Sequence, residues 1–151
     1  MRSILKWTGF LLASVIMAVT AMAEDDSGGL ADRNAIQKTT DAFMKRLEEG
    51  RVLAAYREMK RVLGVDSRPF MKDAEKARKF FKQVRDRVGE PLESALVKTD
   101  TIEDHFHRLS YLQKFESAAL HWQFTFYRPR EEWVLVGVSY STSLDSLYQL
   151  N

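Results

Sequence analysis

The 151-residue chain contains no cysteine and only three prolines and seven glycines. The absence of cysteine excludes disulfide bonds, thiolate metal ligands and a cysteine nucleophile. The sequence also lacks a Gly-rich phosphate loop, a G-x-S-x-G motif and an H-E-x-x-H motif, which mark several large classes of enzyme. The fold must therefore be stabilised by an ordinary hydrophobic core, which a domain of this length can supply.

The first 23 residues differ from the rest of the chain. They contain Arg2 and Lys6, an apolar run from Trp7 to Val19, and the ending Ala21-Met22-Ala23, a pattern typical of a secretory signal peptide. The apolar run is shorter than the roughly 20 residues that span a bilayer. We expect residues 1–23 to be removed on export to the periplasm or the extracellular space, without stable membrane insertion afterwards. An uncleaved membrane anchor is the alternative.

Without residues 1–23, the chain has no excess of positive or negative charge. Without Arg2 and Lys6, the 23 basic residues fall to 21, which equals the number of acidic residues. This balance leaves no electrostatic footprint for nucleic acid, so we expect no nucleic-acid partner. Residues 24–31 are acidic and rich in Gly and Ser, and are expected to be mobile. Residues 32–151 are expected to form a single domain.

Helical periodicity covers the first half of this domain. Asp32 is a good N-cap for a first helix that would end near Gly50. A second helix is predicted from Val52 to just before Gly64, because apolar residues recur there at helical spacing.

The third predicted helix has the strongest start and stop signals. Asp66 or Ser67 can cap it, Pro69 suits its first turn, and Gly89 is a typical stop. We interpret its basic side as a solvated helix face. The alternative is a patch for anionic lipid or an acidic partner, formed by Lys72, Lys76, Lys79, Lys82, Arg85 and Arg87.

The hydrophobic period changes from 3.6 to 2 after Pro91. Strands are predicted at Leu92–Ile102 and His105–Phe115, and two further strands flank the polar break at Arg128–Glu132. The predicted fold class is α+β, with three N-terminal helices packed on a curved antiparallel sheet of about four strands.

The polar break predicts the pairing of the last two strands. A four-residue loop, Arg128–Glu131, built on a type I turn is favoured. The inner face would then carry three pairs: Phe126 with Trp133, Phe124 with Leu135, and Trp122 with Gly137. The outer face would carry one apolar row: Val134, Val136, Val138 and Tyr140. Such a row is rarely left in water, so we expect a second copy of the chain or the C-terminal tail to cover it.

The order of these elements, the helix ending at Arg85–Pro91, and the segment Glu132-Trp133-Val134-Leu135-Val136-Gly137 resemble the nuclear-transport-factor-2-like (cystatin-like) superfamily of α+β cones. The chain is similar in particular to small exported bacterial domains of this superfamily that have no assigned activity. The resemblance implies a pocket at the open end of a cone and dimers through the outer sheet face. It is silent on chemistry, because the superfamily contains both enzymes and non-catalytic binding domains.

The candidate site residues fall into two groups. Aromatic residues could line an apolar ligand pocket, with ordinary core packing as the alternative: Tyr56, Tyr111, Trp122, Phe124 and Trp133. No catalytic residue is assigned, although His107 as a general base with Tyr111 as its partner is an alternative. The superfamily's enzymes usually place Asp with His or Tyr inside the cone, and no acidic residue lies clearly inside a strand here. His105 and His107 lack a third metal ligand, so we expect no metal and no cofactor.

These patterns favour an exported, non-catalytic binding or interaction domain for a small apolar ligand or a protein partner. We expect a homodimer through the outer sheet face. The alternative is a small cofactor-free enzyme, such as an isomerase or a hydrolase, using His107 and Tyr111. A third possibility is an accessory subunit of an envelope complex that docks through the basic third helix.

Overall fold

The computed structural model describes residues 28–148, so the expected signal peptide and residues 24–27 lie outside the described range. The chain is α+β, as predicted, and its elements follow one another in the expected order. The helices are α1 (Arg33–Glu48), α2 (Val52–Met59), a 3-10 turn η1 (Lys60–Val62), α3 (Ser67–Val88) and the short α4 (Asp145–Tyr148). The strands are β1 (Pro91–Ile102), β2 (Phe106–Phe115), β3 (Ala119–Tyr127) and β4 (Val134–Ser141).

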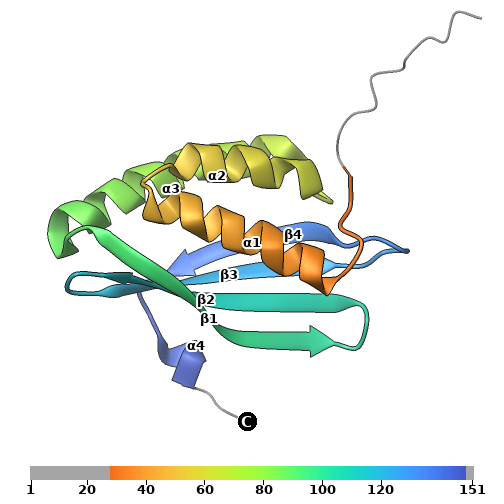
Figure 1. Ribbon diagram of the computed structural model, residues 1–151. Helices are drawn as coiled ribbons and strands as arrows, with labels where there is room; N and C mark the ends of the chain where they lie inside the picture. The colour runs from red at the N-terminus through yellow and green to blue at the C-terminus, as the bar shows by residue number, and fades with distance from the viewer. Residues whose placement is uncertain (1–27, 149–151) are drawn as a thin grey trace, which may run out of the picture.

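The four strands form one open antiparallel sheet in the order β1-β2-β3-β4. Helices α1, α2 and α3 all lie on one face of the sheet, which we call the inner face, and α4 lies on the other (Figure 1). Neighbours in sequence are neighbours in the sheet because antiparallel strands need only short turns between them. This order leaves β1 and β4 as the two edges.

The predicted helix ends are confirmed by their capping geometry. Asp32 accepts a hydrogen bond from the backbone N–H of Ala35 at 2.7 Å, and Asp66 accepts one from Arg68 at 2.9 Å. Each bond satisfies a donor that the first turn of a helix leaves free. Gly89 ends α3 with a φ of 91°, a conformation that favours glycine.

The core lies between α1, α2 and the inner face of the sheet. Phe43 of α1 is at its centre, with ring centroids 5.2 Å from Tyr56, 5.8 Å from Trp122 and 5.1 Å from Phe124. All four rings are buried. These tilted and edge-on contacts fix α1 and α2 over β3.

The predicted pairing of β3 with β4 is wrong. Phe126 pairs with Leu135 rather than Trp133, and the loop therefore runs to six residues, Arg128–Trp133. The loop is longer than expected because Trp133 pairs with Leu30 instead. The backbone N–H of Leu30 donates to the Trp133 carbonyl at 2.7 Å, and Trp133 N–H donates back at 2.8 Å. This bond also ties down Leu30, which lies in the segment expected to be mobile.

A β-bulge changes the pairing a second time. Leu135 faces Phe126 and Gly137 faces Thr125, so Val136 is an extra residue without a partner in β3. Beyond the bulge, the inner-face residues of β3 have new partners: Phe124 pairs with Val138, and Trp122 pairs with Tyr140.

The bulge divides the predicted outer row of Val134, Val136, Val138 and Tyr140, so the prediction of one continuous row is wrong. Val134 and Val136 lie beside Gly64 on the outer face, where a Cβ on Gly64 would overlap Val134. Val138 and Tyr140 instead pack against the core on the inner face. The inserted residue is the physical reason, because it reverses the side to which the rest of the strand points.

The C-terminal tail covers part of the outer face. Helix α4 lies there (Figure 1), and its Leu147 and Tyr148 border a cavity of about 220 Å³ together with Val97 and Leu112 of the sheet. Ile102, at the far end of β1, remains 65% exposed. The tail therefore shields the sheet at one end only.

Candidate functional site

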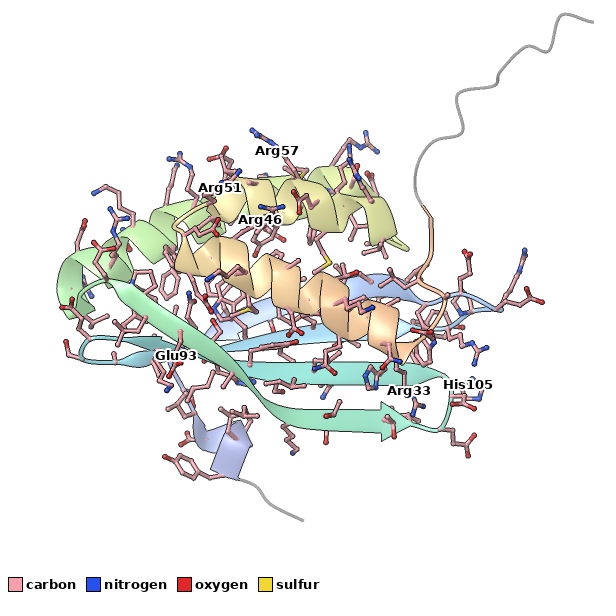
Figure 2. The ribbon with its side chains drawn as sticks, viewed as in Figure 1. Arg33, Arg46, Arg51, Arg57, Glu93 and His105 are labelled. Atoms are coloured by element: carbon pink, nitrogen blue, oxygen red, sulfur yellow. The ribbon has the colours of Figure 1, made fainter. Side chains whose placement is uncertain are left out.

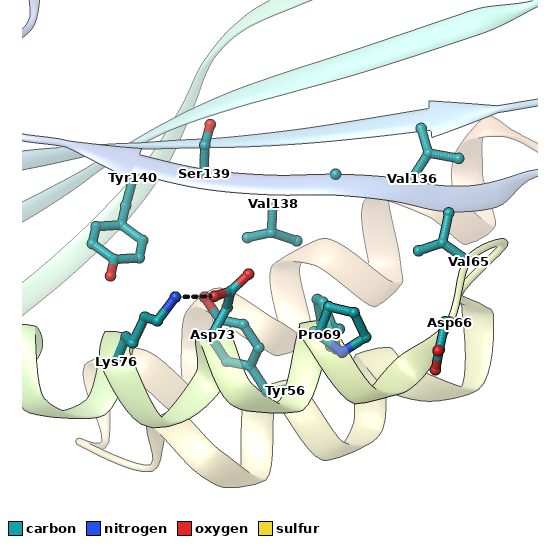
Figure 3. Close-up of a pocket in the computed structure, with 12 residues that line it drawn as sticks. Tyr56, Val65, Asp66, Pro69, Asp73, Lys76, Val136, Val138, Ser139 and Tyr140 are labelled. Carbon is teal, nitrogen blue, oxygen red and sulfur yellow. Dashed lines mark hydrogen bonds and ion pairs between the residues drawn. The ribbon is translucent and has the colours of Figure 1, made fainter.

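The largest of the five described cavities is a cleft between α3 and β4, with a volume of about 610 Å³. We call it the α3–β4 cleft. One wall is β4 from Val136 to Tyr140, and the other is the N-terminal half of α3 with the residues before it, joined by Tyr56 of α2. Figure 3 shows Val138 and Tyr140 pointing from β4 toward α3, whereas Val136 and Ser139 point away. Its volume is within the usual range for small-molecule sites.

The cleft has apolar walls and one polar cluster. Phe70 packs on Tyr56 with ring centroids 5.0 Å apart, and Val138 lies across from them. Beside them, Lys76 Nζ donates to Asp73 Oδ1 at 2.9 Å (Figure 3). An apolar surface with a few convergent polar groups can bind the body of a ligand and orient its head.

The two tyrosines of the cleft keep their protons at neutral pH. Burial raises the pKa of Tyr56 strongly, and the nearby Tyr140 and Asp73 raise it further. Burial likewise raises the pKa of Tyr140, and Asp73 adds to this effect while Lys76 opposes it. Both hydroxyls can therefore donate hydrogen bonds. Within residues 28–148 the Tyr56 hydroxyl makes no hydrogen bond, and Tyr56 lines the cleft although it is only 2% exposed.

Two contacts close the ends of the cleft. At one end, Leu63 forms a parallel bridge to Leu135, and Gly64 N–H donates to the Leu135 carbonyl at 2.9 Å. At the other end, Phe80 of α3 stacks on Tyr140 with centroids 5.0 Å apart. Beyond this stack a second cavity of about 390 Å³ continues between the C-terminal half of α3 and the sheet. Cavities therefore lie between α3 and the sheet along much of the helix.

Only one of the five predicted pocket residues lines this cleft. Tyr56 does so, although its side chain is largely covered. The other four predicted pocket residues are core residues no more than 2% exposed and line none of the five described cavities: Tyr111, Trp122, Phe124 and Trp133. The aromatic pattern therefore identified the core rather than the cavity.

His107 and Tyr111 are both buried on the inner face but do not form a site together. They are four residues apart on β2, which corresponds to about 13 Å along a strand. The Tyr111 hydroxyl donates to Asp41 Oδ1 at 2.7 Å, and burial together with this bond raises its pKa. His107 lies 6.1 Å from the Trp133 ring, and burial together with Arg33 lowers its pKa. Neither side chain borders a described cavity.

The basic surface of the helices is partly neutralised by neighbouring acids. On α3, Lys82 bonds Asp86 at 2.9 Å, and Lys76 bonds Asp73 within the cleft. Arg46, Arg51 and Arg57 lie on the side of the helical layer away from the sheet (Figure 2). Arg46 bonds Glu58 at 2.7 Å. Such exposed pairs reduce the field that a lipid surface or an acidic partner would meet.

Sequence reasoning missed Asp73 and the cleft-facing role of Lys76, because the charged side of the third predicted helix was interpreted as solvent-facing. A weak signal was present, since both residues border the apolar stripe that contains Phe70, Ala74 and Ala77. The cleft itself depends on the bulge at Val136, which has no local sequence signature.

Residues 28–148 contain neither a candidate metal-binding cluster nor a candidate membrane-spanning helix. No three His, Cys, Asp or Glu side chains are grouped closely enough to hold a metal ion. No helix in this part of the chain has the length and apolar character needed to cross a membrane. Comparisons with protein-family models, with curated proteins and with solved structures returned no significant match.

Proposed function

We propose that this protein is an exported, non-catalytic binding domain whose α3–β4 cleft holds a small amphipathic ligand. The observation that carries the proposal is the combination, in one cavity of about 610 Å³, of apolar walls with the unpartnered hydroxyl of Tyr56 and the Asp73–Lys76 pair. Export is inferred from the sequence of residues 1–23 alone.

The polar groups indicate what kind of ligand head fits. Asp73 and Lys76 neutralise one another at 2.9 Å, so an ionic ligand would gain little from either alone. The Tyr56 hydroxyl donates, and the Asp73 carboxylate accepts. A neutral head that both donates and accepts, such as an amide or a hydroxyl, satisfies both groups, while an apolar body lies against Phe70 and Val138.

The proposal is tested with N-phenyl-1-naphthylamine, a neutral apolar probe whose fluorescence rises on leaving water. We expect saturable binding to the purified protein with one site per chain. Replacing Val138 by Trp fills the cleft and should weaken binding at least about tenfold, or about 1.4 kcal/mol. The control is Leu92→Trp, because Leu92 is 56% exposed on β1 and lines none of the described cavities; its binding should stay within about twofold.

A second variant tests the same site with a smaller change to the packing than Val138→Trp. Tyr56→Phe removes only a hydroxyl without a protein partner, so the free energy of unfolding should change little. It should weaken an amide-bearing naphthyl probe more than N-phenyl-1-naphthylamine, which has no acceptor carbonyl. Equal affinity of Val138→Trp and the wild type for the probe, or no saturable binding at all, would contradict the proposal.

A further inference from the structure

The free edge of β4 has unpaired backbone groups. Arg128 N–H donates to the His105 carbonyl at 2.9 Å, so the backbone N–H of Arg128 points toward the β2 side of β3. Hydrogen-bonded and non-hydrogen-bonded pairs alternate along an antiparallel ladder. The backbone groups of Trp122 and Phe124, which are an even number of residues from Arg128, therefore point toward β2 rather than β4.

The partners of these residues in β4 consequently point their own backbone groups away from the sheet. These partners are Tyr140 and Val138. Leu135 shows the same orientation directly, because its carbonyl accepts from Gly64 across the edge. Among residues 28–148, no backbone hydrogen bond from outside the sheet reaches Val136–Ser141. Val138 and Tyr140 thus present two N–H donors and two carbonyl acceptors that another strand can use.

Nothing in the sequence of this edge opposes such pairing. Val134–Ser141 reads VLVGVSYS and contains no charged residue and no proline. Natural proteins usually protect an edge strand with Lys, with inward-pointing charges or with proline, and an apolar edge without them associates readily. The bulge lies before Gly137, so Gly137–Ser141 is a regular segment.

We propose that a second copy of this chain pairs with this edge, β4 against β4 in antiparallel orientation, about a twofold axis at Ser139. In this register Val138 of each copy exchanges both backbone hydrogen bonds with Tyr140 of the other. Every unpaired group of the segment is then satisfied, and one surface is complementary to itself, as a twofold dimer requires. The two sheets become one continuous sheet. This interface replaces the outer-face dimer expected from the sequence.

The charges of α3 beside this edge do not oppose the arrangement. Helix α3 runs alongside β4, with Val65 at the Val136 end and Phe80 at the Tyr140 end. Asp66 is paired with Arg68 at 2.8 Å and Asp73 with Lys76 at 2.9 Å, so a second copy at Ser139 meets no uncompensated charge from these residues.

The chain offers a direct test because it contains no native cysteine. In the proposed register Ser139 lies opposite its own copy as a non-hydrogen-bonded pair, with Cα atoms about 4.5 Å apart, which is within the range of a disulfide. Mild oxidation of Ser139→Cys should therefore give a covalent dimer in high yield. Ser141→Cys is the matched control. Ser141 is also exposed, but its copy would lie four positions further along, about 13 Å away.

A second measurement does not need oxidation. Ser139→Lys places two like charges at the axis and leaves the fold of one copy intact, because Ser139 points to solvent. The dimer dissociation constant measured by sedimentation equilibrium should rise at least about tenfold. The proposal is overturned if the wild type stays monomeric at all concentrations, or if both cysteine variants cross-link equally. A chain of another protein bound at this edge in place of a second copy would also overturn it. Probe binding by a monomer would leave the cleft proposal standing while refuting the dimer.

Discussion

The two edges of the sheet are built in opposite ways. β1 begins at Pro91, contains Glu93, Lys98 and Asp100, and has register shifts between Pro91 and Ser94 and between Leu96 and Lys98. Charges, proline and irregular pairing all prevent another strand from adding to it. β4 has a single bulge and no charge. Of the two edges, β4 is therefore the one that matches the proposed strand pairing, and a search for a partner should begin there.

The edges also differ in how firmly they are attached to the core. Leu135 of β4 is fully buried, whereas Leu96 of β1 is only partly buried. We expect Leu135→Ala to lower the free energy of unfolding by about 2–5 kcal/mol through lost contacts and a residual cavity. Leu96→Ala should cost about 1 kcal/mol. Urea unfolding gives the free energy of unfolding of both variants. Equal losses would mean that the two edge strands are attached to the core equally firmly.

Removing the charges of β1 tests whether they protect that edge. Lys98 and Asp100 lie 3.7 Å apart, and replacing both by Thr removes this pair of charges and retains strand propensity. The two changes are made in the Ser139→Lys variant, in which β4 is blocked. The dissociation constant for self-association should fall about tenfold, or about 1.4 kcal/mol, relative to Ser139→Lys alone. Sedimentation equilibrium provides the measurement. An unchanged mass at high concentration would assign the protection of β1 to its proline and irregular pairing instead.

The smallest effect concerns two buried histidines, one beside each edge. His107 pairs with Thr101 of β1, and His121 pairs with Ser141 of β4. Burial lowers the pKa of both below the ordinary value of 6.5. The unfolded chain therefore binds protons more readily, so stability is fully present above about pH 6.5 and falls as the pH drops through the folded-state pKa values.

This pH dependence is measured by urea unfolding at about pH 7.5 and about pH 5. His107→Gln and His121→Gln should each reduce the loss of stability on acidification. His105→Gln is the control, because His105 is exposed. A profile that stays the same in both buried-site variants would assign the acid sensitivity to carboxylates.

Local signals predicted much of this fold. Asp32, Asp66 and Gly89 mark helix ends because capping depends on a few neighbouring residues, and the structure confirms all three. The aromatic residues of β3 likewise mark the inner face by their alternation. These features are determined within a few residues of chain, so the sequence is sufficient to find them.

The candidate site was not predictable in the same way. The register of the hairpin depends on Leu30, which takes the backbone groups of Trp133 from about a hundred residues away. The direction in which Val138 and Tyr140 point depends on the bulge at Val136, which no local sequence pattern marks. A strictly alternating strand would have turned both residues outward, and the cleft would have had no apolar wall on that side.

The bulge also has a genetic consequence. Val136 is a residue that β4 carries in excess of its partner strand. In-frame loss of its codon would restore a regular ladder, with Gly137 outward and Val138 and Tyr140 still directed at α3. Most deletions within a strand turn every later side chain to the wrong face. This strand can therefore shorten by one residue during evolution and keep both its cleft wall and its pairing edge.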